Sequence, residues 1–299
     1  MKIQVDYFQK TDMAVMQFDI VKNYTPTESQ LLAEVGDADV VVFVGGISPS
    51  LEGEEMKVSE PGFKGGDRTD IELPQAQRKV MEMLHRAGKR VVFVNCSGSA
   101  IAMVPETENA ESILQAWYPG ERGGEAVAKV LFGEVNPSGK LPVTFYKSTS
   151  DLPDFLDYTM KNRTYRYFKG EALFPFGHGL SYTSYEYGKP ALKKVKNSSA
   201  YSLSFSLSNK GNREGTEVAQ VYIKRMDDAE GPIKTLKAFK RITLKAGEKQ
   251  QVTISLPRQS FEGWDSQTNT MRVVPGKYQI FVGASSAEAA KNVIEVKVK

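Results

Sequence analysis

Two short apolar runs constrain the fold of this chain most, because neither alternates between apolar and polar residues. They are DVVVFVGG at residues 39–46 and KRVVFVNC at residues 89–96. Continuous runs of this kind are typical of strands buried on both faces of a parallel sheet. Residues 73–88 between them carry apolar side chains at helical spacing, with Pro74 near the start and Gly88 at the end. Strand, helix and strand in this order predict a βαβ unit.

The neighbouring segments extend the same alternation. Residues 28–35 read as a short helix capped by Thr27, residues 112–117 as a short strand, and residues 121–132 as a helix. Residues 3–21 alternate roughly with period two and predict one or two strands. The first half of the chain therefore predicts an α/β domain with a mostly parallel sheet.

The pattern changes after Gly139. Residues 146–188 are rich in Pro, Gly, Tyr and Phe and lack periodicity, so we expect a long, ordered connector. Beyond it only short alternating strands appear, separated by turn signals such as residues 209–212 and 275–277, which predicts a β-sandwich of about 100 residues. The strands are expected at residues 201–207, 217–223, 240–244, 251–256, 278–283 and 293–296.

Composition excludes several classes of protein. The 299 residues carry a net charge of +3, with Lys and Arg spread along the chain, which argues against a nucleic-acid partner. No apolar run reaches about 18 residues, so neither a transmembrane helix nor a membrane partner is predicted. A single cysteine, Cys96, excludes an intramolecular disulfide. Because His85 and His178 are the only histidines, we expect no metal centre and no cofactor. The first residues lack the apolar core of a signal peptide, which leaves the localisation unknown.

Four stretches together resemble family 3 glycoside hydrolases. They are WYPGERGGEA at residues 117–126, VLFGEVNPSGKLPVTF at 130–145, RTYRYF at 163–168 and PFGHGLSYT at 175–183. The resemblance implies a barrel that carries an aspartate nucleophile, then an α/β sandwich domain whose loop carries a glutamate acid/base, then often a fibronectin type III-like (immunoglobulin-like) sandwich. It implies β-glucosidase or β-xylosidase activity for the parent enzyme, with an oligosaccharide or glycoside as substrate.

On this resemblance the chain divides into four parts. Residues 1–27 resemble the tail of a carbohydrate-binding module that some members insert, and residues 28–145 an incomplete α/β sandwich domain. Residues 146–188 form the connector and residues 189–299 the fibronectin type III-like domain. The barrel is expected to be missing, so we expect the isolated chain to be inactive and its exposed barrel-facing surface to allow self-association. The parent enzyme is expected to be periplasmic or secreted.

The loop after the first apolar run is the strongest candidate for chemistry. It contains Glu52, Glu54 and Glu55 and leaves the carboxyl end of a strand, where open α/β sheets place ligand sites. By resemblance Glu52 is the acid/base, with Glu54 as the alternative. Alternatively, the same residues form a solvated acidic loop without a catalytic role.

Other candidates have structural alternatives of equal weight. Asp67 and Arg68 could line the substrate entrance or hold the loop as an internal pair, and Phe63 could stack on a sugar or pack in the core. His178 is expected to be a structural group, and Cys96 an inert one. Residues 163–167 are expected to form a strut, and the two tryptophans, Trp117 and Trp264, to lie in the core.

The sequence offers two rival functions. The glycines at residues 45–46 follow a strand, as in nucleotide-binding turns, but the G-x-G-x-x-G pattern and a P-loop lysine are both absent. A non-catalytic carbohydrate-binding or structural module stays as the alternative to a glycosidase fragment, and assays of sugar binding and hydrolysis discriminate the two.

Overall fold

The structure is a computed structural model of the chain that describes residues 26–51, 58 and 60–299. It forms two compact units, residues 1–38 and 39–299, which are taken separately below. The strands expected at residues 3–21 lie outside the described residues. Among the residues described, no helix combines the length and apolar character that a membrane crossing needs.

The first unit contains helix α1 (Glu28–Val35). Its N-terminus is closed by a capping box, in which the Gln30 amide nitrogen donates to Thr27 Oγ1 and the Thr27 amide nitrogen donates to Gln30 Oε1, at 3.3 and 3.0 Å. The helix ends at Gly36, whose φ of 58° favours glycine. The predicted helix and its threonine cap are confirmed.

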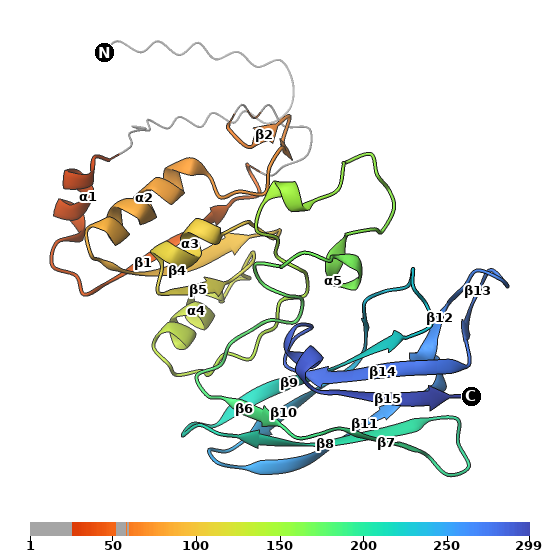
Figure 1. Cartoon of the computed structure of the whole chain (residues 1–299). Helices are drawn as coiled ribbons and strands as arrows, with labels where there is room; N and C mark the ends of the chain where they lie inside the picture. Colours follow the sequence, from red (N-terminus) through yellow and green to blue (C-terminus); the bar gives the residue numbers. More distant parts are fainter. Residues whose placement is uncertain (1–25, 52–57, 59) are drawn as a thin grey trace, which may run out of the picture. The chain divides into compact units, whose positions relative to one another are not determined.

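The second unit begins with a parallel sheet of strand order β1-β4-β5, with helices on both sides (Figure 1). Val42 lies beside Val92 and Val44 beside Val94, so the two apolar runs are neighbours, as predicted. Helix α2 follows β1 and contacts both β1 and β4. The elements are β1 (Val40–Ile47), α2 (Gln75–Arg86), β4 (Arg90–Ser97), α3 (Val104–Asn109), β5 (Ser112–Gln115) and α4 (Gly123–Leu131).

Burial differs sharply between the two apolar runs. In β4, Val91, Phe93 and Val94 are at most 1% exposed, which confirms a buried strand. In β1, Val42 is 47% and Val44 64% exposed, so the prediction that this run is buried on both faces is wrong. Within the described residues β1 is an edge strand that pairs with β4 alone, and one face of it is left uncovered.

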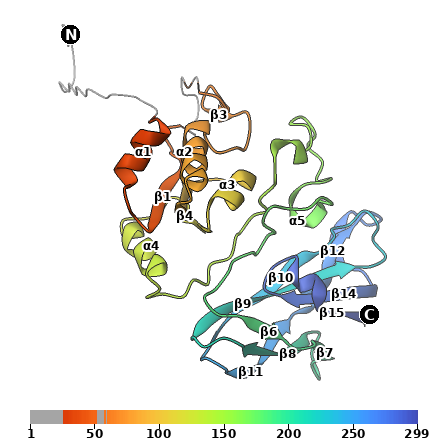
Figure 2. The ribbon, with the colours of Figure 1, turned by 60° about the vertical axis from the view of Figure 1, so that its left-hand side comes forward.

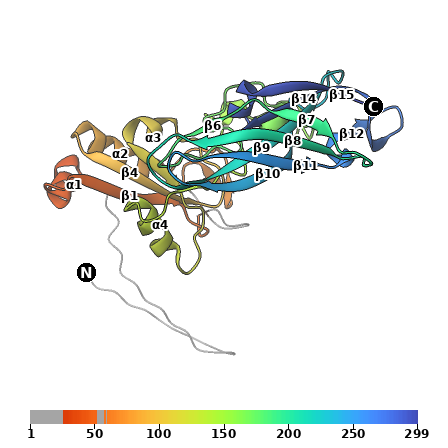
Figure 3. The ribbon, with the colours of Figure 1, turned by 90° about the horizontal axis from the view of Figure 1, so that it is seen from below.

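The C-terminal part consists of antiparallel strands in two main sheets, of order β10-β9-β14-β15 and β11-β8-β6, with β7 also on β8, and a separate two-stranded ribbon of β12 and β13 (Figures 2 and 3). Inward residues of both sheets form one apolar cluster. An α/β domain followed by an all-β sandwich is thus confirmed. The strands are β6 (Tyr185–Tyr187), β7 (Ala191–Lys194), β8 (Tyr201–Asn209), β9 (Gly215–Arg225), β10 (Thr235–Leu244), β11 (Lys249–Leu256), β12 (Glu262–Asp265), β13 (Thr270–Val273), β14 (Gly276–Gly283) and β15 (Val293–Val298), with short 3-10 turns η2 (Arg258–Phe261) and η3 (Glu288–Lys291).

The connector is ordered through contacts with the all-β domain. It contains the short turns η1 (Thr149–Asp151) and α5 (Thr164–Tyr167). The Tyr165 ring stacks on Phe176 with 4.2 Å between the centroids, and its hydroxyl accepts a hydrogen bond from the Leu236 amide at 3.0 Å. These contacts fit the interpretation of residues 163–167 as a strut.

A joint between the α/β domain and the all-β domain is built from the NPSGK stretch. The Asn136 side chain donates to the Glu214 carbonyl at 3.0 Å and accepts from the Tyr182 amide at 2.8 Å. Lys140 and Glu217, both nearly buried, form an ion pair with 3.1 Å between Nζ and Oε1. The joint gives the amide and the lysine of this motif a structural role.

Candidate functional site

Buried polar side chains gather at the carboxyl edge of the parallel sheet. The Asn95 side-chain amide, at the end of β4, donates to Gln115 Oε1 at 2.6 Å and to Ser97 Oγ at 3.2 Å. Ser97 in turn donates to the Ser99 carbonyl at 3.0 Å. These bonds link the ends of β4 and β5 and satisfy the Asn95 side-chain NH2 group and the Ser97 hydroxyl, while Oδ1 of Asn95 has no hydrogen-bond partner among the described residues.

The root of the glutamate loop is fixed at Gly46. Gln77 of helix α2 accepts from the Gly46 amide at 2.8 Å and donates to the Gly46 carbonyl at 2.7 Å. Gly46 has a φ of 129°, and a Cβ there would lie 2.0 Å from the Cys96 carbonyl oxygen, so only glycine fits. One residue later, the Ile47 carbonyl accepts from the Tyr118 hydroxyl at 2.8 Å. The loop therefore departs from the sheet in a set direction.

The predicted acid/base Glu52 and its alternative Glu54 lie outside the described residues. The described chain leaves the root through a turn in which the Leu51 amide donates to the Ser48 carbonyl at 3.0 Å. On the far side of the loop is a small hairpin of β2 (Phe63–Lys64) and β3 (Asp67–Arg68). The structure thus gives the two flanks of the candidate loop.

The hairpin is fastened to the segment that follows β4. Arg68 donates from Nη1 to Ser99 Oγ at 2.8 Å and to the Ala100 carbonyl at 3.3 Å, and from Nε to the Asp70 carbonyl at 3.1 Å. These bonds give Arg68 a holding role in the loop. They bring the hairpin to the carboxyl edge of the sheet, beside the Asn95 and Ser97 network.

Asp67 and Phe63 occupy opposite environments on the hairpin. Asp67 is exposed, and its backbone pairs with Lys64. Phe63 is only 8% exposed, which favours a core contact over stacking on a sugar. Of the three predicted substrate-binding residues, Asp67 is therefore the one whose side chain is open to solvent.

A buried ionic cluster holds the helices behind this edge. Arg78 of α2 donates from Nε to Glu106 of α3 at 2.7 Å and from Nη2 to Glu72 at 3.0 Å. Burial lowers the pKa of Arg78, but the hydrogen bonds and charges of Glu106 and Glu72 outweigh it and raise the pKa above its ordinary value. The guanidinium stays charged and ties α2 to α3.

The remaining candidates from the sequence have aromatic or partly buried surroundings, and Trp117, expected in the core, is half-buried. The His178 ring stacks on Phe174 at 5.4 Å, and Trp117 meets Phe145 edge to face at 6.2 Å. Cys96 is half-buried at the end of β4. Trp264 is 54% exposed on β12, so its predicted place in the core is wrong, because the β12–β13 ribbon leaves it open to solvent.

The sequence alone does not identify Gln77, Tyr118 or Asn95 as parts of this site. Gln77 and Gly46 are 31 residues apart, and Tyr118 and Ile47 are 71 apart, so no local pattern links them. Tyr118 alone carried a signal, because it belongs to the WYPG stretch.

Two family models match the chain. The model described as "Glycosyl hydrolase family 3 C-terminal domain" matches residues 4–182, and that described as "Fibronectin type III-like domain" matches residues 217–286. The first covers the α/β domain, with the glutamate loop, and most of the connector. The second identifies the all-β sandwich as the fibronectin type III-like domain expected from the sequence.

Among curated proteins, the chain is 50% identical over 279 residues to a xylan 1,4-beta-xylosidase of Xylanibacter ruminicola, covering 93% of this chain and 32% of that protein. It is 34% identical to a periplasmic beta-glucosidase of Salmonella typhimurium, covering 87% and 34%. The chain thus spans about a third of the length of these relatives.

Solved structures of β-glucosidases are also similar to this chain. A β-glucosidase from Erythrobacter marinus matches with a TM-score of 0.75 and 35% identity, covering 91% of this chain and 36% of that one. A β-glucosidase from Kluyveromyces marxianus in complex with glucose matches with a TM-score of 0.78 and 29% identity, covering 91% and 33%.

Proposed function

We propose, from the premise that this chain belongs to glycoside hydrolase family 3, that it forms the C-terminal part of a retaining β-glycosidase. In this proposal Glu52 is the acid/base, and the nucleophile is an aspartate on a barrel domain outside these 299 residues. The substrate is a β-xyloside or a β-glucoside. The observation that carries the proposal is the fixed root of the glutamate loop at the carboxyl edge of the sheet.

The geometry supports a loop that reaches away from its own domain. Gln77 and Tyr118 fix one flank at Gly46 and Ile47, and Arg68 fixes the other at Ser99. A carboxyl group carried between two fixed flanks can be presented to a neighbouring domain without disturbing the sheet. Ligand sites of open α/β sheets lie at this edge.

The proposed mechanism divides the work between two carboxyl groups about 5–5.5 Å apart. The barrel aspartate attacks the anomeric carbon while Glu52 donates its proton to the departing glycosidic oxygen. Glu52, now a carboxylate, removes a proton from the water that attacks the glycosyl-enzyme intermediate. The aspartate leaves unchanged, and the sugar keeps its anomeric configuration.

The comparisons bear on the choice of sugar. The relative with 50% identity is named for xylan, whereas the relative with 34% identity is named a β-glucosidase. Between the two proposed substrate classes, β-xylosides are favoured by this difference.

We further propose that the chain alone is inactive, because the acid/base cannot replace the carboxylate that forms the covalent intermediate. Exposed apolar side chains support a surface that another domain covers. Phe155 is 88% and Tyr158 87% exposed on the connector, in addition to the open face of β1. Without a covering domain, such patches favour self-association.

Replacement of Glu52 in the full-length enzyme tests the proposal. We expect Glu52→Gln to lower turnover of substrates with poor leaving groups by about 10²–10⁴-fold, since general acid assistance is worth that much. Activated aryl glycosides need little proton assistance and should lose far less. Azide should partly restore Glu52→Ala, because it attacks the intermediate without a base.

Two controls locate the acid/base and test the isolated chain. Glu54→Gln measures the alternative position, and Glu60→Gln, an exposed glutamate on the same loop, should behave as the parent. If Glu54→Gln shows the leaving-group pattern, the assignment to Glu52 fails. Hydrolysis by the isolated chain of a glycoside with a poor leaving group, lost in Glu52→Gln, would show that it holds a complete active site.

A further inference from the structure

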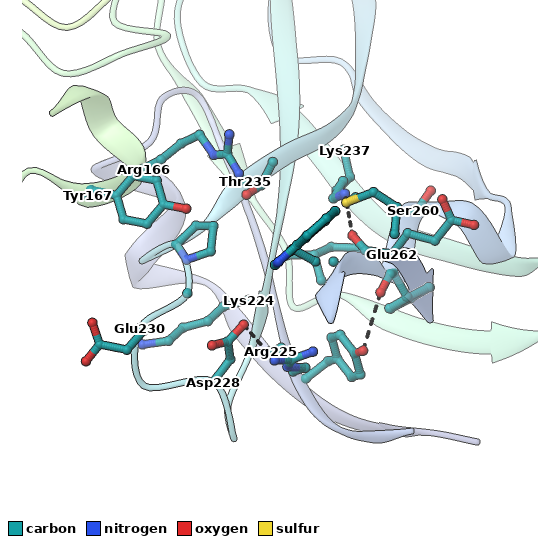
Figure 4. A pocket seen from close by; sticks show the side chains of 18 of the residues that line it. Arg166, Tyr167, Lys224, Arg225, Asp228, Glu230, Thr235, Lys237, Ser260 and Glu262 are labelled. Atoms are coloured by element: carbon teal, nitrogen blue, oxygen red, sulfur yellow. Dashed lines mark hydrogen bonds and ion pairs between the residues drawn. The ribbon is translucent and has the colours of Figure 1, made fainter. Parts of the chain in front are cut away.

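A pocket of about 340 Å³ lies in the all-β domain, between the connector turn α5 and strands β9, β10 and β12 (Figure 4). Its volume is within the range of small-molecule sites. Its lining mixes cationic, acidic and aromatic side chains from segments far apart in the sequence, including Arg166, Arg225, Asp228, Lys237 and Trp264.

The cations that line this pocket, Arg166, Lys224, Arg225 and Lys237, differ in their partners. Arg225 is paired with Asp228 at 2.7 Å, so its charge is balanced inside the protein. Lys237 donates to the backbone carbonyl of Glu262 at 3.1 Å, which satisfies one donor, and it forms no ion pair among the described residues. Nε of Arg166 and Nε of Arg225 are both buried without a hydrogen-bond partner in the part of the chain that the structure describes. Unlike Arg225, Arg166 forms no ion pair there, and its guanidinium carbon lies 5.6 Å from the centre of the Tyr167 ring.

Arg166 and Lys237 come from α5 and β10 and are drawn on either side of Thr235 (Figure 4). Burial lowers the pKa of Lys237, and the positive charge of Arg166 lowers it further, while Glu262 opposes both effects. Two partly buried cations that repel one another create a place where an anion is stabilised. A carboxylate between them would receive charge-assisted hydrogen bonds, which are the stronger kind.

The same pocket offers an apolar platform. Trp264 is 54% exposed and lies opposite Met271, which is 57% exposed, across the β12–β13 ribbon. The face of an aromatic ring carries partial negative charge, so it packs well against the C–H groups on one face of a pyranose. Glu230 and Glu262 also line the pocket and can accept hydrogen bonds from sugar hydroxyls.

We propose that this pocket binds a carboxylate-bearing sugar, a uronic acid unit of a glycan. The carboxylate lies between Arg166 and Lys237, and the ring lies against Trp264. This site extends the proposed function from cleavage to recognition of an acidic sugar by the fibronectin type III-like domain.

A matched pair of ligands tests the proposal with the full chain. Methyl β-D-glucuronoside and methyl β-D-glucoside differ only at C6, which is a carboxylate in one and a hydroxymethyl group in the other. Calorimetric titration should show the glucuronoside binding at least about tenfold more tightly than the glucoside or acetate, because only the glucuronoside uses both halves of the pocket. No binding at millimolar ligand, equal binding of the glucoside, or equal binding of acetate would each overturn the proposal.

Variants locate the site. Arg166→Gln, Lys237→Gln and Trp264→Ala should each weaken glucuronoside binding at least about tenfold, with thermal unfolding confirming that each variant is folded. Lys240→Gln is the matched control, because Lys240 is also on β10 and donates to a backbone carbonyl, that of Thr253, at 3.2 Å. Binding that survives all three pocket variants, or falls equally in Lys240→Gln, places the ligand elsewhere and overturns the proposal.

Discussion

The two domains differ in how completely they close their cores. In the all-β domain, Leu203 and Phe205 of one sheet and Val221 and Ile280 of the other are at most 1% exposed and form one cluster. In the α/β domain the sheet is buried at β4 but open at β1, where Val44 is 64% exposed. The difference teaches that the sequence pattern of a segment can predict a strand, whereas the burial of that strand depends on which neighbouring elements cover it.

The domains also differ in what holds them. Apolar packing alone accounts for the centre of the all-β sandwich, while the α/β domain adds the buried Arg78–Glu106 pair between α2 and α3. If this contrast is correct, each domain should be most sensitive to a different kind of substitution.

The largest expected effect is in the α/β domain. Glu106→Ala should lower the free energy of unfolding by about 3–5 kcal/mol, because it leaves the Arg78 guanidinium buried without its main partner. Urea denaturation followed by circular dichroism measures the change. Glu108→Ala, exposed on the same helix, is the control. Equal effects of the two substitutions would show that the ionic cluster does not hold this domain.

The all-β domain should respond to loss of apolar volume. Leu203→Ala should cost about 2–5 kcal/mol, the usual range for a fully buried leucine, since it leaves a cavity between the two sheets. Phe239→Ala, at a site that is 65% exposed, should change stability by no more than about 0.5 kcal/mol. A Leu203→Ala cost as small as that of Phe239→Ala would contradict the closed core.

A smaller effect is expected from His178, on the connector between the domains. Burial, and then the charge of Lys140, lower the pKa of His178, so protons bind preferentially to the unfolded chain. The stabilisation is present above the unfolded pKa of about 6.5 and is lost as the pH falls through that value toward the lowered folded pKa. The free energy of unfolding should be measured from pH 8 to pH 5, a range that brackets about 6.5. We expect it to change less with pH in His178→Gln than in the parent or in His85→Gln. An unchanged slope in His178→Gln would exclude His178 as the cause.

The smallest effect on stability is expected at the open face of β1. Val42→Thr with Val44→Thr should change the free energy of unfolding by no more than about 0.5 kcal/mol, because both side chains are already exposed and threonine also suits strands. The same pair should reduce self-association measured by sedimentation velocity. A large loss of stability would mean that this face is covered in solution.

Much of the fold could be predicted because its main elements carry strong local patterns. Helix α1 has its cap at Thr27, α2 has apolar residues at helical spacing, and the long strands alternate. The short elements were missed because so few residues give no period. These are β2, β3, α5, β6, β7, β12 and β13, together with the six-residue α3, which contains Pro105.

The candidate site was less predictable than the fold. The glutamate loop could be found because it follows a recognisable strand and resembles a family stretch. Its fastening to Gln77, Tyr118 and Ser99 could not, because those partners are 31 to 71 residues away along the chain. The exposure of Trp264 depends on how one ribbon lies against the sandwich, which no alternation of residues encodes.

The joint at Asn136 limits how these domains can be recombined. Its partners are divided between the two domains: Glu214 and Glu217 belong to the all-β side, and Asn136 and Lys140 to the other. A chimera that took each domain from a different relative, with the crossover in the connector, would take the two members of the Asn136–Glu214 and Lys140–Glu217 pairs from different proteins. A domain exchange should therefore succeed when one relative supplies the whole stretch from residue 133 to the C-terminus. The crossover point useful to an engineer then lies inside the α/β domain.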